Sequence, residues 1–244
     1  KMYSNLSISM TVEEEEQIRY ILDKRKNDIP LSYILKKHLF YKYDFYVDEN
    51  VLIPRSETEG IIDQILIKGD ELYSDRNRCN FLDVGCGSGC VGITIANERP
   101  NWNVVLSDIS TKAMMVAKKN TRLSNQKNIK LACGDWLKAF GANSFDFIFS
   151  NPPYISVSDH RVDKSVLCNE PSSAIFSGTD GLDDIKKIIK SSQRVLSQLG
   201  ILFMENGINQ ADKIRHLLES NEFTDISVHL DYNNKSRFTS SRKK

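Results

Sequence analysis

The residues best suited to chemistry are the tetrapeptide Asn151-Pro152-Pro153-Tyr154, which directly follows the apolar segment FDFIFS. Two successive prolines hold the backbone extended and carry no N–H donors, so the carbonyl groups beside them stay free to accept hydrogen bonds. Asn151 adds a side-chain carbonyl, and Tyr154 adds a flat ring with a hydroxyl. The tetrapeptide therefore predicts a rigid site for an N–H₂ group on a planar π system, with the two protons accepted by the Asn151 side-chain oxygen and the Pro152 carbonyl.

Such a site would suit methyl transfer to nitrogen. An amide or aromatic amine nitrogen shares its lone pair with the π system and is a poor nucleophile. Holding both N–H bonds favours a pyramidal nitrogen and aims its lone pair at the methyl donor, so positioning and electrostatics would supply most of the acceleration. No strong general base is required, because the nitrogen becomes acidic only as the methyl group arrives.

A glycine-rich segment upstream, NFLDVGCGSGCVGITIA, predicts a nucleotide-like cofactor. Its glycines lie between an apolar strand and a helix, where the backbone can approach a ligand closely and helix N–H groups face that ligand. The run from Gly87 to Gly92 matches the dinucleotide pattern G-x-G-x-x-G, which leaves a nicotinamide or flavin enzyme open. The form D-x-G-x-G-x-G, starting at Asp83, is more similar to the S-adenosylmethionine loop of methyltransferases. The expected cofactor-binding residues of this loop are Asp83, Gly85, Cys86, Gly87, Ser88 and Gly89.

Three further residues complete the expected cofactor site. Asp108 ends the next predicted strand, and a carboxylate there can accept both ribose hydroxyls of an adenosine. Asp135 and Trp136 follow the third strand, where the adenine edge would lie and an aromatic face could stack on the purine. A role for Asp83 as a cap of the loop, and for Trp136 in simple packing, stay open.

The elements that must position these residues alternate between apolar strands and amphipathic helices, as in a parallel sheet covered by helices. Two final strands around the turn-like segment 231–234 predict an antiparallel hairpin at the end of the sheet. This α/β pattern resembles the class I, Rossmann-like methyltransferase fold. The expected strands are 80–84, 103–108, 128–133, 145–150, 200–205, 224–230 and 236–240, and the expected helices are 90–98, 110–123, 183–199 and 210–220.

The N-terminal part predicts a smaller unit. Residues 11–26 have an amphipathic helical pattern, which ends before Pro30. Residues 41–53 are dense in aromatic and β-branched side chains around the turn-forming segment 48–50, which predicts a β-hairpin.

Composition limits the class of protein. With 244 residues, 40% of them hydrophobic, and a net charge of +1, the chain fits a globular fold without the overall positive charge typical of phosphate-dominated nucleic-acid binding. Five cysteines without a C-x-x-C pair favour a reducing compartment and no metal site. No membrane-spanning run or signal peptide is visible, so we expect no membrane contact and a cytoplasmic location, or an organellar one if a targeting segment is removed. The basic residues of 235–244 are expected to form a solvated tail.

Several segments, taken in order, resemble the HemK/PrmC family of peptide-chain release factor N5-glutamine methyltransferases. The resemblance implies transfer of a methyl group from S-adenosyl-L-methionine to the side-chain amide of the glutamine in the Gly-Gly-Gln motif of release factors, with a release factor as the protein partner. The matching segments are PLSYIL at 30–35, VLIPRSETE at 51–59, NPPYI at 151–155, EPSSAIFSGTDGL at 170–182 and ENGINQ at 205–210.

The resemblance also implies roles for individual residues. Asp83 would lie near the sulfonium end of the cofactor, and Asn151 would contact both the cofactor and the acceptor amide. The residues implied in cofactor contact are Gly85 to Gly89, Asp108, Trp136 and Asn151. Those implied in binding or shaping the acceptor are Asn151, Pro152, Pro153, Tyr154, Glu170, Pro171 and Glu205. Arg55, Glu57, Thr58 and Glu59 would lie near the cofactor pocket without an assigned task, and a surface arginine and a scaffold glutamate remain alternatives for Arg55 and Glu205.

The family pattern divides the chain into a truncated N-terminal helical segment (1–29), a β-hairpin linker (30–60) and a methyltransferase domain (61–244). Lys36 stands where the family usually has glycine, which puts the local backbone geometry in doubt. The family's N-terminal helical domain is usually longer than the segment before Pro30, so either it is cut away here or the protein grips its partner with less surface.

Two other functions stay open at this point. The NPPY motif also resembles the site of adenine-N6 DNA methyltransferases and some guanine-N2 ribosomal RNA methyltransferases, so an adenine-N6 DNA or RNA methyltransferase is the main alternative. Base flipping would demand a basic channel and further stacking aromatics. A binding module without catalysis is the other possibility. We expect no specific nucleic-acid partner, and the sequence does not predict an oligomeric state.

Overall fold

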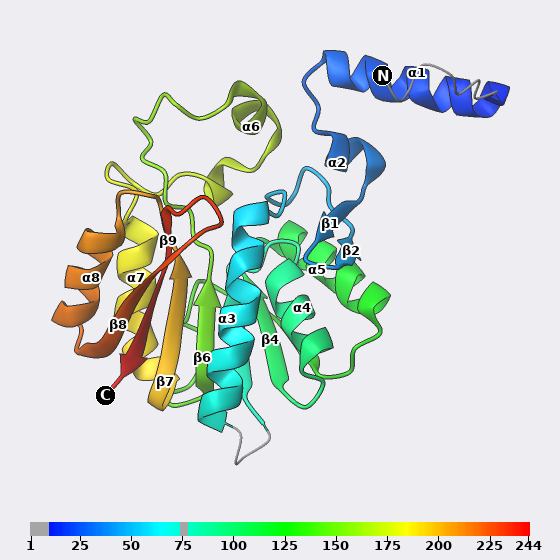
Figure 1. Ribbon diagram of the computed structural model, residues 1–244. Coiled ribbons are helices and arrows are strands. Elements are labelled where there is room, and N and C mark those ends of the chain that lie inside the picture. The colour runs from blue at the N-terminus through cyan, green and yellow to red at the C-terminus, as the bar shows by residue number, and fades with distance from the viewer. Residues whose placement is uncertain (1–9, 74–77) are drawn as a thin grey trace.

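A computed structural model describes residues 10–73 and 78–244 of the chain. Its centre is a sheet of seven strands: β3 (Asn80–Val84), β4 (Asn103–Asp108), β5 (Ile129–Cys133), β6 (Phe145–Ser150), β7 (Leu196–Glu205), β8 (Phe223–Leu230) and β9 (Ser236–Lys243). Their order in space is β5-β4-β3-β6-β7-β9-β8 (Figure 1). The first five in this order are parallel, whereas β9 runs antiparallel to both β7 and β8. The predicted α/β fold with an antiparallel C-terminal hairpin is confirmed.

Helices cover the sheet on both faces (Figure 1). Because side chains alternate along a strand, Phe147 packs into one core and Ile148 into the other. The short helix α6 (Lys164–Asn169) lies in the long connection after β6. The first face carries α3 (Ser56–Tyr73), α4 (Cys90–Glu98) and α5 (Thr111–Ser124), and the second carries α7 (Asp183–Val195) and α8 (Ala211–Ser220).

Two predictions for the C-terminal half are wrong. The helix expected over 183–199 ends at Val195, and β7 begins at Leu196. Leu196 is fully buried and pairs with Phe145 of β6, so sheet pairing outweighs the helical pattern there. The expected solvated tail at 235–244 mostly forms β9, which lies inside the sheet, and Lys243 Nζ donates to the Leu196 carbonyl at 2.7 Å.

The predicted hairpin exists but is displaced. Its strands are β1 (His38–Phe40) and β2 (Tyr43–Phe45), so the chain turns at residues 41–42 rather than at 48–50. Beyond β2, the backbone N–H and carbonyl of Tyr46 bond to the side-chain amide of Asn120 at 2.7 and 2.9 Å. A side chain from α5 therefore takes the place that a strand partner would have held.

The N-terminal elements connect to the sheet through α3. Helix α1 (Val12–Lys26) starts at a capping box, has no buried residue and projects away from the sheet (Figure 1). Helix α2 (Leu31–Leu35) ends at Lys36, whose φ of 53° is in the left-handed region that favours glycine. Helix α3 runs through residues 60 and 61, so the predicted linker and methyltransferase domain share one helix. Residues 1–9 of the predicted segment 1–29 lie outside the described residues.

Candidate active site

The glycine loop and the tetrapeptide lie side by side because of the register between β3 and β6. Val84 pairs with Ser150, so the chain leaves both strands at the same edge of the sheet. The Ser150 hydroxyl donates to the Val84 carbonyl at 2.8 Å and strengthens this pairing. The strand order reverses between β3 and β6, and open α/β sheets bind ligands outside the carboxyl ends of their strands at such a point.

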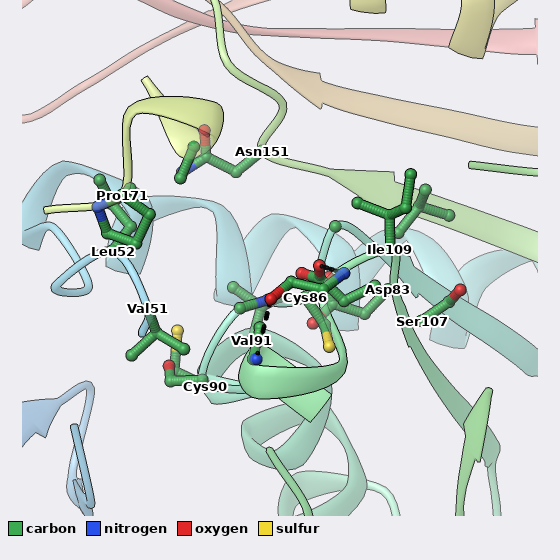
Figure 2. A pocket seen from close by; sticks show the side chains of 18 of the residues that line it. Val51, Leu52, Asp83, Cys86, Cys90, Val91, Ser107, Ile109, Asn151 and Pro171 are labelled. Carbon is green, nitrogen blue, oxygen red and sulfur yellow. Dashed lines mark hydrogen bonds between the residues drawn. The ribbon is translucent and has the colours of Figure 1, made fainter. Parts of the chain in front are cut away.

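A pocket of about 1070 Å³, counted with its open mouth, occupies this edge (Figure 2). Figure 2 shows Asn151 and Pro171 at one side of the pocket and the Asp83–Cys86 segment at another. Of the predicted site residues, Asp83, Gly85, Cys86, Gly87, Ser88, Asp108, Trp136, Asn151, Pro153 and Pro171 line the pocket, whereas Gly89, Asp135, Pro152, Tyr154 and Glu170 do not.

The glycine loop offers backbone to a ligand. Gly87 has a φ of 54°, and a Cβ there would meet nothing within 4 Å, so this backbone faces open space. Helix α4 begins after Gly89 without a side-chain cap, and Cys90 and Val91 of its first turn line the pocket. The first N–H groups of a helix have no partner within the helix, so they are available to polar groups of a ligand.

Asp108 lies beside the loop at the end of β4. Its Oδ2 accepts from the Gly87 N–H at 2.9 Å, and its Oδ1 accepts from the Ser110 N–H at 2.8 Å. Burial raises the pKa of this carboxyl, while the N–H donors act in the opposite direction. Each carboxylate oxygen has two acceptor positions, so Asp108 can accept two further hydrogen bonds, as a ribose with two hydroxyls would need.

Asp83 is almost fully buried in the floor of the pocket (Figure 2). Its Oδ2 accepts from the Gly92 N–H at 2.9 Å. Burial raises the pKa of this carboxyl to about 7, and the Asp108 charge adds to the effect. A cationic group in the pocket would stabilise the ionised form, so Asp83 suits a ligand with a positive centre.

Asn151 brings an unused amide to the pocket (Figure 2). Among the described residues, no hydrogen-bond partner is found for its side chain or for the Pro152 carbonyl. Neither Pro152 nor Pro153 has an N–H to donate. Within the described part of the chain, the end of β6 therefore has two acceptors without a partner, which is the number that an N–H₂ group needs.

Tyr154 does not line the pocket. Its hydroxyl donates to Oε1 of the buried Glu205 at 3.2 Å, and its backbone carbonyl accepts from Gln210 Nε2 at 2.9 Å. Burial and the nearby Glu205 charge raise the pKa of the Tyr154 hydroxyl, so it stays protonated near neutral pH.

Trp136 lies over the glycine loop, whereas Asp135 does not reach the pocket. A Trp136 ring carbon lies 3.2 Å from where a Cβ on Gly85 would be, and the indole Nε1 donates to Asp184 Oδ1 at 3.2 Å. Asp135 pairs instead with Lys138 at 2.5 Å near the surface. The structure therefore places only Trp136 where a cofactor could touch it.

Glu170 joins the N-terminal linker (residues 30–60) to residues 171–174, which form the rim of the pocket. Its Oε2 accepts from the Ile53 N–H at 3.0 Å, and its Oε1 pairs with Arg55 at 2.7 Å. Both oxygens face the linker, and the next residue, Pro171, lines the pocket. The direct contact of Glu170 with substrate stays a prediction.

Sequence reasoning missed several apolar walls of the pocket. Val51 and Leu52 come from the linker, Ile109 follows β4, and Ala174 belongs to the rim (Figure 2 labels the first three). Ile109 is 65% exposed directly after Asp108. For Ile109, an apolar residue next to an expected ribose acceptor was the available signal. For Val51 and Leu52, the signal was their place in the family-like segment 51–59.

The pocket cysteines are poor nucleophiles. Burial raises the pKa of both the Cys86 and the Cys90 thiol, that of Cys90 to about 12, so neither supplies a thiolate near neutral pH. In residues 10–73 and 78–244, no cluster of His, Cys, Asp or Glu is arranged to hold a metal ion. Within the same ranges, no helix combines the length and apolar character needed to cross a membrane.

Comparison with known proteins first gives the class. A family model described as the Methyltransferase small domain matches residues 69–231. The solved catalytic domain of hMettl16, in complex with the MAT2A 3′UTR hairpin 6, has a TM-score of 0.65 and 16% identity, and the match covers 81% of this chain and 74% of that one. At that identity the likeness shows the fold alone. The protein is a methyltransferase with a class I fold.

Closer relatives give the particular family. The release factor glutamine methyltransferase of Francisella tularensis is 36% identical over 210 residues, which cover 86% of this chain and 73% of that protein. The one from Buchnera aphidicola (subspecies Acyrthosiphon pisum) is 31% identical over 240 residues, covering 98% and 84%. The chain belongs to the release factor glutamine methyltransferase family, and the resemblance seen in its motifs is confirmed.

Proposed function

We propose that this protein transfers a methyl group from S-adenosyl-L-methionine to the side-chain amide nitrogen (N5) of the glutamine in the Gly-Gly-Gln motif of a peptide-chain release factor. The observation that carries the proposal is the Asn151 amide, which lines the pocket and, like the neighbouring Pro152 carbonyl, has no hydrogen-bond partner among the described residues. The names of the relatives support a release factor glutamine as the acceptor. A cytoplasmic location and the lack of a specific nucleic-acid partner stay predictions.

The pocket residues suit S-adenosylmethionine. Asp108 would accept the ribose hydroxyls with the positions that Gly87 and Ser110 leave free. The glycine loop, Gly85 to Gly89, would lie along the methionine part, with Asp83 near the sulfur. When bound, S-adenosylmethionine supplies a methyl group on a positively charged sulfur.

The acceptor amide would be held by hydrogen-bond acceptors alone. The Asn151 side-chain oxygen accepts one amide proton and the Pro152 carbonyl accepts the other, which leaves the nitrogen lone pair to face the pocket. Fixing the nucleophile in this way removes rotational freedom before the reaction. The nitrogen loses a proton only after the new N–C bond forms, so the absence of a strong base among Tyr154, Cys86 and Cys90 is no obstacle.

Mass spectrometry of a methylated release factor tests the proposal. The purified protein is incubated with a release factor and isotope-labelled S-adenosylmethionine, and the peptide with the Gly-Gly-Gln motif is analysed for one added methyl group. A release factor in which this glutamine is replaced by glutamate is the control, because it has no amide nitrogen. Methyl transfer to DNA or RNA oligonucleotides, with none to the release factor, would replace the proposal by the adenine-N6 alternative.

A further inference from the structure

Three polar side chains form a buried chain between the cofactor pocket and the tetrapeptide. Thr58, which lines the pocket from the first turn of α3, donates through Oγ1 to Glu205 Oε2 at 2.6 Å. Tyr154 donates through its hydroxyl to Glu205 Oε1 at 3.2 Å. Thr58 and Glu205 are 3% and 1% exposed. One carboxylate at the end of β7 therefore joins the wall of the pocket to the last residue of the tetrapeptide.

The backbone of Tyr154 is held as firmly as its hydroxyl. Its carbonyl accepts from Gln210 Nε2 at 2.9 Å, and the Oε1 of the same side chain accepts from the Gly207 N–H at 2.9 Å. A Cβ on Gly181 would lie 2.2 Å from the Tyr154 carbonyl oxygen, so the backbone is closely enclosed on that side as well. Tyr154 is thus fixed at both ends, which leaves its ring little freedom to rotate.

Burying the Glu205 carboxylate between Thr58 and Tyr154 costs free energy. Removing a charge from water costs free energy, and an apolar side chain of similar volume usually fills a core at lower cost. The guanidinium of Arg237, held by Asp231, offsets part of this cost. What Glu205 adds over an apolar residue is a pair of directed hydrogen bonds, one to Thr58 and one to Tyr154.

We propose that Glu205 is a positioning residue for methyl transfer, which holds the Tyr154 hydroxyl and so fixes the tetrapeptide that presents Asn151 to the pocket. Thr58 supports Glu205 from the side of the cofactor pocket. The inference rests on the proposed function only for the identity of the acceptor amide. Glu205 acts through Tyr154, so its loss should slow the reaction without weakening cofactor binding.

A double-mutant cycle tests this role with Glu205→Ala, Tyr154→Phe and the combined variant. Turnover of a full-length release factor gives kcat and KM, and calorimetry gives the affinity for S-adenosylhomocysteine. We expect each single variant to lower kcat about 10- to 100-fold, since a misplacement of about 1 Å can cost about 100-fold. The combined variant should be no slower than the slower single variant, and cofactor affinity should change less than about threefold, well below the loss in kcat.

Conservative and control variants separate positioning from folding. Glu205→Gln should recover most of kcat, because its oxygen can accept from Tyr154 while its N–H₂ donates to Thr58. Asp146→Asn is the matched control: Asp146 is also buried on the sheet, bonds the Asn80 N–H at 2.9 Å, and lies at the opposite strand ends, so it should lower the melting temperature but not kcat. If Glu205→Ala fails to fold, Thr58→Val takes its place in the cycle with Tyr154→Phe.

Three results would overturn the inference: multiplicative losses in the combined variant, a loss of cofactor affinity parallel to the loss in kcat, or a crystal structure of the Glu205 variant with Tyr154 unmoved. The crystal structure does not depend on the acceptor. It therefore tests whether Glu205 holds Tyr154 even if the wild-type protein leaves the release factor unmethylated. In that case the proposed function fails separately.

Discussion

At the residue scale, three polar groups around one sheet edge have different surroundings, and the roles that we propose for them differ accordingly. Asn151 has a side-chain amide without a partner in the part of the chain that the structure describes, Asp83 is a buried carboxyl facing the pocket, and Glu205 is a buried carboxyl facing two hydroxyl donors. Asn151 and Asp83 both line the pocket, and each has a local signal in the sequence: Asn151 directly precedes two prolines, and Asp83 lies two residues before the first glycine of the loop. Nothing local in the sequence tells which hydroxyls bond to Glu205, since Thr58 lies 147 positions away along the chain.

Replacement of Asn151 by Ala should lower kcat about 100- to 1,000-fold, the range seen when one hydrogen-bonding group that stabilises a transition state is removed. Affinity for S-adenosylhomocysteine should stay within a few-fold of wild type, because the residues proposed to hold the adenosine belong to other segments. Steady-state kinetics and calorimetry measure the two quantities. Nearly unchanged turnover would show that another group holds the acceptor amide.

Binding of S-adenosylmethionine should strengthen as the pH rises from 6 to 8. Burial raises the pKa of Asp83 to about 7, so the carboxyl is mostly neutral at pH 6 and mostly ionised at pH 8. Only the ionised form attracts the positive sulfur, and one pKa unit corresponds to about tenfold in affinity, which sets the size of the effect. Calorimetry at both pH values gives the ratio.

S-adenosylhomocysteine is the control for this pH effect, because its sulfur is neutral while its other contacts are shared. Titration of Asp108 acts on both ligands and cancels in the comparison. An Asp83→Asn variant should bind the two ligands with the same weak pH dependence. Equal pH dependence of both ligands in the wild-type protein would contradict a sulfur-facing role for Asp83.

At the element scale, the best predicted segments are strands bounded on both sides by strong local signals. β3, β4 and β6 match expectation because each is a short apolar run that ends at glycine, aspartate or proline. The start of β7 and the place of the hairpin were missed because distant partners decide them: Phe145 pairs with Leu196, and Asn120 bonds the backbone of Tyr46. The local pattern of apolar and polar residues in the sequence carries no information about such partners.

The contact between α4 and β4 should be intolerant of a single added methyl group. In Gly92→Ala the new Cβ would lie 2.2 Å from Leu106 Cδ2 and 3.1 Å from Asp83 Oδ2, so either the buried Leu106 side chain or the helix must shift. We expect a loss of about 1–3 kcal/mol in the free energy of unfolding and weaker cofactor binding. Urea unfolding and calorimetry measure both effects.

Gly141→Ala is the control for the added methyl group, because Gly141 is exposed and its Cβ would meet only the Ser144 hydroxyl at 3.3 Å. Its stability should stay close to wild type. Equal stability of the two variants would mean that α4 has room to shift.

At the scale of the whole molecule, the N-terminal linker and the rim of the pocket are bonded to each other, so we expect them to loosen together. Glu170 bonds both Ile53 and Arg55 of the linker, while Val51, Leu52 and Pro171 line the pocket from the two sides. The sequence indicated that both segments matter but not that they bond to each other, since 117 positions separate Glu170 from Ile53.

Replacement of Glu170 by Ala should loosen both segments together. The change leaves the Ile53 N–H without its partner and removes the ion pair with Arg55, so we expect a loss of about 1–3 kcal/mol in stability and weaker cofactor binding. Hydrogen exchange should quicken at residues 50–55 and at 171–176 in the same variant. Asp159→Asn, which breaks an exposed ion pair with Arg161, should leave exchange at both segments unchanged, and faster exchange on one side only would speak against a shared unit.

The place of β9 between β7 and β8 affects how the sheet forms while the chain is being synthesised. Among the strands that the structure describes, β8 pairs with β9 alone, so during synthesis the sheet stays open along β7 until β9, which ends at residue 243, has been made. Until then Glu205 lacks its neighbour Phe238, and β7 offers an unpaired edge of the kind that invites aggregation. A nascent chain stalled before residue 236 should therefore need a chaperone, whereas a chain that includes β9 should not.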